Sequence, residues 1–206
     1  MKKAAVLVHG LGRTSFSMLL LGTYLKRHGF TVLYYSYNSA RDILDGHFAK
    51  FADYLNSIAE KYQDSEIHFV THSMGGILVR GALTPEIFAK FANPGRIVML
   101  APPNRGSGMA TRLSKYKIIG KILKPLQELS DTPDSKVKNL PVPESMEIGI
   151  ITGKFDAKVK PEEAILDGTK EYLTVNAAHT FIMNRHDVMK AVLNFLNSGK
   201  FNSQKE

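Results

Sequence analysis

Residues 66 to 80 decide the fold, and they read Glu66-Ile67-His68-Phe69-Val70-Thr71-His72-Ser73-Met74-Gly75-Gly76-Ile77-Leu78-Val79-Arg80. The first part has the alternation of a β-strand, and after Gly76 the apolar spacing becomes that of a helix. Ser73 lies at the change. A strand that turns into a helix within about one residue strains the central residue and needs small neighbours. Gly75 is such a neighbour, so we expect the Ser73 hydroxyl to project from a tight turn.

This turn approaches the pattern G-x-S-x-G, in which the serine is a nucleophile. Thr71 stands where the first glycine is usual. An ordinary strand–turn–helix junction that contains a serine is the alternative interpretation. The predicted strand before Ser73 and the predicted helix after it favour the nucleophile, and they direct the N–H of Met74 at the position where an oxyanion would form.

A second strand end carries a glycine-rich loop. Residues 4–8 are small and apolar without alternation, which is typical of a strand buried on both faces of a parallel sheet. The loop that follows is His9-Gly10-Leu11-Gly12. The phosphate-binding patterns G-x-x-x-x-G-K-[ST] and G-x-G-x-x-G are absent. We therefore expect the N–H of Leu11 to face that of Met74 as the second oxyanion donor, with His9 orienting the loop.

The elements around these loops alternate between strand and helix. The pattern predicts helices over 15–28 and 43–62 and after Ser73, and strands over 30–35, 67–71 and 96–100. This order is typical of an α/β protein with a doubly wound, mainly parallel sheet flanked by helices. Ligands of such sheets lie beyond the carboxyl ends of the strands, where Gly10, Ser73 and residues 102–104 fall.

The alternation lapses between residues 101 and 144, and strands over 146–153 and 171–175 and a helix over 186–196 complete the chain. We interpret residues 1–206 as a single domain, with residues 104–144 as a short helical insertion and candidate cap before the last two strands. Apolar residues at helical spacing predict a helix over 114–129, interleaved with lysines. The favoured interpretation is a core-packed helix with a solvated lysine face; the alternative is a helix that docks on lipid or covers the site.

A serine nucleophile needs a neighbouring base, and the base needs a carboxylate. In one common arrangement the chain order is serine, acid, histidine, each on a loop after a strand. Asp156 follows the strand over 146–153, and His179 follows the strand over 171–175. Ser73, Asp156 and His179 are therefore the candidate catalytic residues.

Other residues compete for these roles. His72 adjoins Ser73, but neighbours on a sharp turn point apart, so we expect it to support the structure. His186 is a competing base that would face away if the last helix starts near it. Asp167 precedes a glycine and is typical of a turn, and Asp187 is typical of a first helical turn.

Taken together, these motifs resemble the α/β-hydrolase superfamily, and within it small bacterial lipases and esterases, including lidless triacylglycerol lipases and hydrolases related to the inositol deacylases. The resemblance covers nearly the whole chain and is carried by residues 9–12, 71–76, 153–159 and 179–183. It implies hydrolysis of carboxylic esters through an acyl-serine intermediate, without a cofactor. Two departures are Thr71 and the length of the segment Asn104 to Glu144.

Composition narrows the remaining possibilities. The chain has 206 residues, no cysteine and a formal charge of +8. Without cysteine there is no disulfide and no thiolate metal site, and the N-terminal apolar run is too short for a secretion signal, so we expect a cytoplasmic protein. The lysines are scattered without a nucleic-acid-binding motif, so we expect no nucleic-acid partner; weak contact with an anionic membrane surface is compatible with the charge.

The resulting hypothesis is a serine esterase or lipase that acts on a small-molecule ester or a lipid and has no metal or cofactor. Ser73, Asp156 and His179 form its triad, Leu11 and Met74 supply the oxyanion N–H groups, and His9, Gly10, His72 and Gly75 support the site. Acyl transfer or thioester cleavage by the same triad is one alternative, because fold and triad do not select the acyl donor. A non-catalytic binding module with this fold is another.

Overall fold

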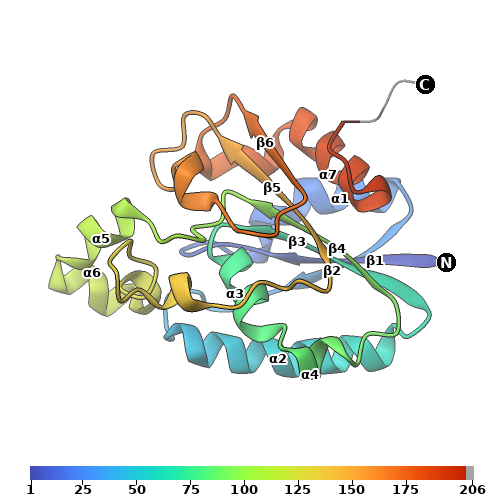
Figure 1. Ribbon diagram of the computed structural model, residues 1–206, viewed down its shortest axis with the longest axis horizontal. Helices are drawn as coiled ribbons and strands as arrows, with labels where there is room; N and C mark the ends of the chain where they lie inside the picture. Colours follow the sequence, from blue (N-terminus) through green and yellow to red (C-terminus); the bar gives the residue numbers. More distant parts are fainter. Residues whose placement is uncertain (203–206) are drawn as a thin grey trace.

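A single six-stranded sheet forms the centre of the molecule (Figure 1). The structure is a computed structural model and describes residues 1–202. The strand order is β2-β1-β3-β4-β5-β6 and every neighbouring pair is parallel. The predicted α/β sheet is confirmed, and its described strands are wholly parallel. Their bounds are β1 Lys2–Val8, β2 Phe30–Tyr35, β3 Ser65–His72, β4 Pro94–Leu100, β5 Glu147–Gly153 and β6 Glu171–Val175.

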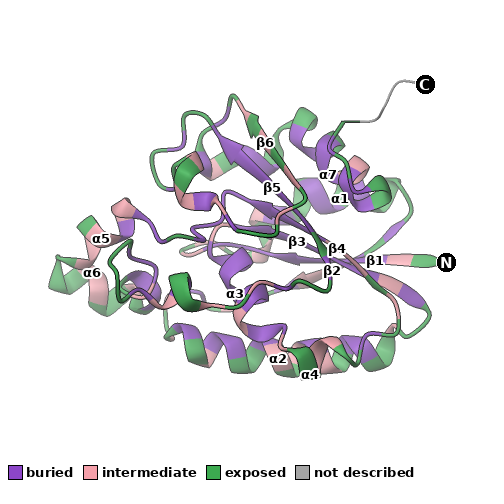
Figure 2. Ribbon diagram, in the orientation of Figure 1, coloured by how far each residue is buried: buried purple, intermediate pink, exposed green. Residues whose placement is uncertain are grey.

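Helices cover both faces of this sheet. Helices α1 (Leu19–Arg27) and α7 (His186–Ser198) lie on one face, and α2 (Leu44–Lys61), α3 (Met74–Ala82) and α4 (Pro85–Phe88) lie on the other (Figure 1). Each face has its own apolar cluster, and the central strands are buried almost throughout (Figure 2). Continuous apolar strands such as β1 are required by this two-sided burial. None of the helices in residues 1–202 is long and apolar enough to cross a membrane.

The direction of winding reverses between β1 and β3. The chain passes from β1 to β2 on one side and then returns to place β3 on the other side of β1, with Val8 opposite Thr71. A crevice forms at the carboxyl ends of strands where the order reverses in this way. The loop after β1 and Ser73 after β3 both lie at this crevice.

The first α-helix is shorter than the helix predicted over 15–28. The first turn of that range is a 3₁₀ helix, η1 (Ser15–Met18), which leads into α1. Met18, Leu21 and Leu25 are buried against the sheet, whereas Phe16 and Leu20 are exposed. Apolar residues occur on both sides of this helix, so the spacing alone did not identify its buried side.

The single helix predicted over 114–129 is wrong. The chain instead forms α5 (Gly108–Ser114), α6 (Lys117–Ile122) and the 3₁₀ turn η2 (Lys124–Leu126). Tyr116 has extended backbone angles and Pro125 cannot continue a helix, so the regular structure breaks at both points. Ile118 and Ile122 are 75% and 62% exposed, and α6 buries none of its residues. This part projects at one end of the molecule (Figure 1); 3₁₀ turns η3 (Lys136–Asn139), η4 (Pro161–Ala164) and η5 (His179–Asn184) complete the fold.

A buried arginine fastens both ends of the 104–144 segment to α3. The Arg80 guanidinium donates to the backbone and side-chain oxygens of Asn104, at 3.2 Å each, and to the carbonyls of Leu140 and Pro141, at 2.5 and 3.2 Å. Burial lowers the pKa of Arg80 to about 10. A buried cation requires such acceptors, so this contact determines where the segment leaves and rejoins the sheet.

Protonation of a buried histidine is expected to limit stability in acid. The Nδ1 atom of His68, in β3, accepts the N–H of Arg96 at 3.0 Å. Burial, with the charges of Arg96 and Lys3, lowers the pKa of His68 from 6.5 to about 3. Glu66 Oε2, 3.5 Å from Nε2, favours the proton but does not offset the burial. Between those two pH values only the unfolded chain takes up this proton, so the stabilisation is complete above pH 6.5 and is lost as the pH falls towards 3.

We predict that His68→Gln, whose amide oxygen can still accept the Arg96 N–H, loses less unfolding free energy than the wild type between pH 7 and pH 4. The difference should be on the order of 2 kcal/mol, measured by urea unfolding at several pH values. Equal losses in the two proteins would contradict the assignment, because the other histidines are common to both.

Candidate active site

Ser73 occupies a strained turn between β3 and α3. Its backbone angles are φ 52° and ψ −125°, a conformation that non-glycine residues rarely adopt. Two hydrogen bonds hold it there: the Ser73 N–H donates to the Leu100 carbonyl at 2.8 Å, and the Gly76 N–H donates to the Ser73 carbonyl at 2.9 Å. The predicted tight turn is therefore present, with Ser73 at its apex.

Two glycines allow the end of β1 to touch this turn. A Cβ atom at position 75 would lie 2.5 Å from the Val8 carbonyl oxygen and 2.9 Å from that of His9, and one at position 10 would lie 2.9 Å from the Ser73 Cβ. Only glycine fits without movement of the backbone at position 75. The close approach places the loop after β1 directly beside Ser73.

The unusual Thr71 is accommodated by a glycine on the helix. Thr71 is fully buried, and a Cβ atom at position 76 would lie 3.2 Å from its Oγ1. Because Gly76 has no side chain, α3 can pack closely against the Thr71 side chain. The departure from G-x-S-x-G at position 71 is thus matched by a second glycine after the serine.

Asp156 and His179 form a buried pair. His179 Nδ1 donates to Asp156 Oδ2 at 2.7 Å, and Asp156 Oδ1 accepts the N–H groups of Lys158 and Val159 at 2.8 Å each. The exposed fractions of Asp156 and His179 are only 6% and 7%. Since Nδ1 carries the proton in this bond, Nε2 is left as the free acceptor of the imidazole.

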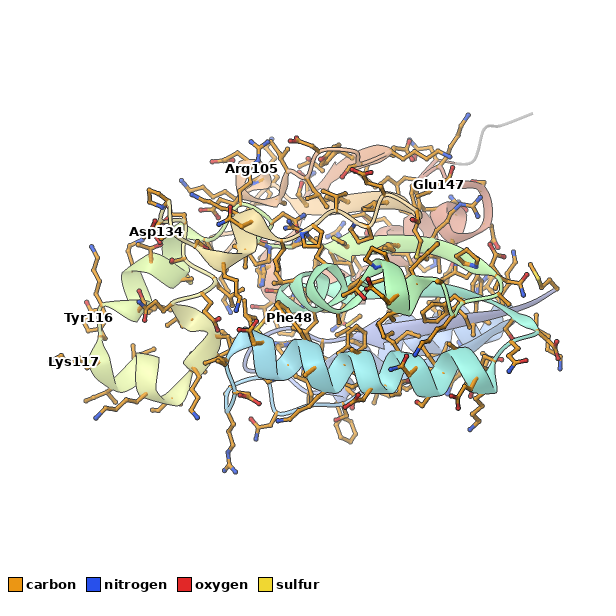
Figure 3. All side chains as sticks on the ribbon, turned by 60° about the horizontal axis from the view of Figure 1, so that its bottom comes forward. Phe48, Arg105, Tyr116, Lys117, Asp134 and Glu147 are labelled. Carbon is orange, nitrogen blue, oxygen red and sulfur yellow. The ribbon has the colours of Figure 1, made fainter. Side chains whose placement is uncertain are left out.

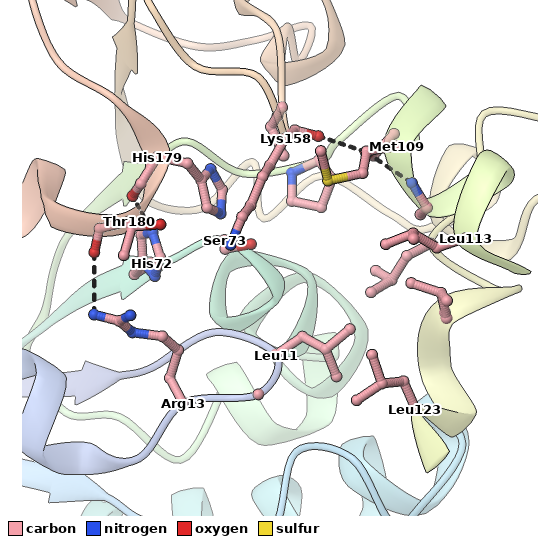
Figure 4. Close-up of a pocket in the computed structure, with 17 residues that line it drawn as sticks. Leu11, Arg13, His72, Ser73, Met109, Leu113, Leu123, Lys158, His179 and Thr180 are labelled. Carbon is pink, nitrogen blue, oxygen red and sulfur yellow. Dashed lines mark hydrogen bonds between the residues drawn. The ribbon is translucent and has the colours of Figure 1, made fainter. Parts of the chain in front are cut away.

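Ser73 and His179 line the same pocket, and Figure 4 shows the imidazole beside Ser73. The Ser73 hydroxyl has no hydrogen-bond partner within residues 1–202. Bonds between nucleophile and base are often long in free enzymes and shorten when substrate binds. The structure thus brings the three sequence-predicted catalytic residues to one edge of the sheet; their roles remain predictions.

The two predicted oxyanion donors lie on either side of this turn. Met74 is the first residue of α3, where an N–H has no acceptor within the helix, and Leu11 lines the pocket. Neither N–H donates to a backbone carbonyl in residues 1–202. Both groups are therefore available to an oxygen of a bound substrate.

His9 holds the loop after β1 in place. Its ring stacks on Tyr37 with centroids 4.3 Å apart, and Nδ1 donates to the Gly10 carbonyl at 3.0 Å. The Tyr37 hydroxyl donates to the His9 carbonyl at 2.8 Å. Burial is the main cause that lowers the pKa of His9, so it acts here as a neutral structural group.

His72 connects the serine turn to the loop of the candidate base. Its Nε2–H donates to the His179 carbonyl at 3.0 Å, and the two rings lie 4.7 Å apart. Burial and then the charge of His179 hold the pKa of His72 well below its usual value. His72 therefore contacts the backbone of His179 through a hydrogen bond; its supporting role stays a prediction.

The competing residues lie elsewhere. His186 is exposed and packs against the Tyr24 ring, 5.8 Å between centroids. Asp167 faces Arg105 at 3.6 Å, and Asp187 pairs with Arg185 at 2.7 Å. Residues 1–202 contain no group of three acidic, histidine or cysteine side chains that could hold a metal ion.

The pocket has an apolar part that the motifs did not reveal. One wall comes from the 104–144 segment. Two cationic residues also line the pocket: Arg13, which lies near Thr180, and Lys158, whose side chain extends towards Ser73 (Figure 4). Of these lining residues, only Lys158 could have been found from the sequence, because it lies two residues after the candidate acid Asp156. The apolar wall consists of Leu11, Met109, Ala110, Leu113, Leu123, Leu126, Leu129 and Val159.

Comparison with known families agrees with this geometry. The sequence profile described as the alpha/beta hydrolase family matches residues 5–156, which is most of the chain. The chain belongs to the alpha/beta hydrolase family. No curated protein matches this alpha/beta hydrolase by sequence.

Several solved structures share the fold of this alpha/beta hydrolase at low sequence identity. A Bacillus licheniformis lipase in mature form has a TM-score of 0.70 and 17% identity, with 88% of this chain and 86% of the lipase covered; this chain covers 52% of the propeptide form. A metagenomic carboxyl esterase has a TM-score of 0.66 and 19% identity, with 86% of this chain and 64% of the esterase covered. A putative thioesterase from a Silicibacter species has a TM-score of 0.64 and 18% identity, with 91% of this chain and 72% of the thioesterase covered. These likenesses show a common fold.

We predict that Gly75→Ala destabilises the protein by about 2 kcal/mol, because the added methyl group meets backbone oxygens. Gly120→Ala in α6 is the matched control: its Cβ would meet only the Ser114 carbonyl oxygen at 3.8 Å, and the helix should gain about 0.5 kcal/mol. Urea unfolding measures both. Equal stability of the two variants would contradict the close approach.

Proposed function

We propose that this protein is a serine hydrolase that cleaves carboxylic esters through an acyl-serine intermediate. The observation that carries the proposal is the buried Asp156–His179 pair, whose free imidazole nitrogen belongs to the pocket that Ser73 lines. A bare serine hydroxyl is a weak nucleophile at neutral pH, and such a pair is what activates it. The strained turn that exposes Ser73 supports the same function.

The proposed reaction has two halves. Ser73 Oγ attacks the ester carbonyl carbon while His179 Nε2 takes its proton, and Asp156 stabilises the imidazolium. The N–H groups of Leu11 and Met74 donate to the oxyanion. The intermediate expels the alcohol, which takes the proton from His179. Water then attacks the acyl-serine with His179 as base, and the acid and free Ser73 are released.

The apolar wall of the pocket favours an ester with a hydrocarbon acyl chain. Such a wall stabilises a chain by about 0.8 kcal/mol for each buried methylene. The same triad could transfer the acyl group to an alcohol or cleave a thioester, and competing acceptors and thioester substrates would separate these reactions. A binding module without catalysis is the other class, and it would not react with a fluorophosphonate probe. A cytoplasmic location stays a prediction from the sequence.

We predict that Ser73→Ala lowers kcat for p-nitrophenyl butyrate by at least about a thousandfold, and that His179→Gln has a similar effect, because the triad residues act as a unit. His186→Gln, a substitution at an exposed histidine outside the pocket, is the matched control and should keep the wild-type rate. Circular dichroism checks folding. A Ser73→Ala variant that keeps most of its rate would refute the proposed function.

Contact with an anionic membrane surface would bring a lipid substrate to this pocket. Ile118 and Ile122 of α6 are largely exposed, and Figure 3 shows Tyr116 and Lys117 projecting at the end of the molecule. We call residues 115–124 the basic segment; it includes α6 and contains Lys115, Lys117, Lys121 and Lys124. No ammonium group among these four forms an ion pair in residues 1–202. Lipid headgroups would attract the lysines, and the apolar side chains would enter the interface.

We predict that replacing the four lysines of the basic segment by glutamine weakens binding to phosphatidylglycerol-containing vesicles by at least about tenfold, since each lysine contributes up to about 1 kcal/mol. The control replaces four exposed lysines elsewhere, Lys26, Lys90, Lys190 and Lys200, and so has the same net charge. Vesicle sedimentation at two salt concentrations measures the affinity. Equal binding of the two quadruple variants would argue against this contact.

A further inference from the structure

The two sides of the pocket differ in chemistry. The wall from the 104–144 segment is apolar, whereas Arg13 contacts Thr180 and the end of the Lys158 side chain lies beside Ser73 (Figure 4). No aspartate or glutamate lines the pocket. Asp156 lies behind it, and its oxygens are occupied by His179 Nδ1 and two backbone N–H groups. The positive charge on this side is therefore not neutralised locally.

The direction of the proposed reaction assigns these sides to the two parts of an ester. His179 must protonate the leaving oxygen, so the leaving group lies on the histidine side of Ser73. The acyl chain then extends along the apolar wall. Any charged group on the alcohol part of the substrate would meet Arg13 and Lys158.

Lys158 is suited to bind such a group. Its backbone is fixed, because its N–H donates to Asp156 at 2.8 Å and its carbonyl accepts the Ser107 hydroxyl at 2.5 Å. Its side chain extends towards Ser73 in Figure 4 and lines the pocket. No ion pair or hydrogen bond engages its ammonium group within residues 1–202. The fixed backbone thus places a cation without a partner within reach of an anion in the pocket.

Arg13 is a second cation that lines the same pocket. Its guanidinium donates to the Thr180 carbonyl at 3.0 Å and lies 5.8 Å from the Phe181 ring centroid. The charges of Arg13 and Lys158 both reach His72 and contribute to lowering its pKa. Two cations thus act on one small region beside the candidate base.

We propose that the leaving group of the natural substrate carries an anion, a phosphate or a carboxylate, which Lys158 binds with Arg13 beside it. This inference rests on the proposed ester hydrolysis and names its substrate class: an acyl ester of an anionic alcohol. Such an alcohol occurs in an anionic lipid and in a soluble metabolite, and the experiment has one arm for each source.

The soluble arm compares 4-nitro-3-(octanoyloxy)benzoate with the matching uncharged benzamide. The lipid arm compares octanoylglycerol phosphate with octanoylglycerol. The quantity measured is kcat/KM for the anionic ester divided by kcat/KM for the neutral one, so that differences in expression and acyl binding cancel. Thermal unfolding checks that each variant is folded. Lys158 is the residue tested, because Arg13 also holds the backbone next to His179.

Lys158→Gln should lower this ratio by about fivefold and Lys158→Glu by about twentyfold, while Lys158→Arg should restore most of it. High salt should reduce the wild-type ratio. Lys200→Gln is the matched control and should leave the ratio unchanged. Lys200 follows Gly199, which lies near Arg96 and Glu147 at the starts of β4 and β5, the ends of these strands that point away from the pocket.

A lower ratio in either arm supports the proposal, and the arm with the larger change identifies the source of the anion. A ratio that is the same in wild type, Lys158→Gln and Lys158→Glu in both arms would overturn it. Wild-type hydrolysis of the neutral esters would then still stand, so that result leaves the proposed function intact. Absence of wild-type hydrolysis of all four esters would overturn the inference and the proposed function together.

Discussion

The whole site depends on the contact between the end of β1 and the turn that follows β3. These parallel strands are neighbours, and the missing side chain at Gly75 lets the turn reach the carbonyls of Val8 and His9. Ser73 takes its strained backbone conformation in that contact. The order of the strands reverses at the same point, which opens the crevice. Fold and candidate site therefore share one geometric constraint.

A second layer of interactions keeps titratable groups in defined states around this contact. His9 and His72 are buried, with pKa values lowered chiefly by burial, and each uses one ring nitrogen to hold a backbone carbonyl. His179 alone of these histidines faces a carboxylate, that of Asp156. The three histidines therefore differ in their partners: His9 and His72 bond to backbone carbonyls, and His179 bonds to a carboxylate.

Much of this arrangement could be predicted from the sequence, because each central strand is apolar and each candidate residue directly follows a strand. The order of elements predicts the sheet, and the loops after β1, β3, β5 and β6 predict which residues meet at its edge. The insertion was less predictable. Its apolar residues have helical spacing, but Pro125 and the extended backbone at Tyr116 break it into short pieces. Its place against the sheet depends on Arg80, whose contacts join parts of the chain that are distant in sequence.

The pocket itself was the least predictable part. Its apolar wall and its two cations come from separate loops, and only the folded chain shows that Lys158 extends towards Ser73 while Arg13 lies near Phe181. Spacing along the sequence carries no information about such a shape. Thr71 is a similar case, because its fit depends on the absence of a side chain at Gly76.

The central claim is that Ser73 becomes a nucleophile through His179, and covalent labelling tests it most directly. Protein treated with a fluorophosphonate is digested, and the modified peptide is identified by mass spectrometry. We expect a single phosphonylated residue, Ser73, with labelling that is lost when His179 is replaced by glutamine. A label on another serine, or labelling of Ser73 that is equally fast without His179, would contradict the account.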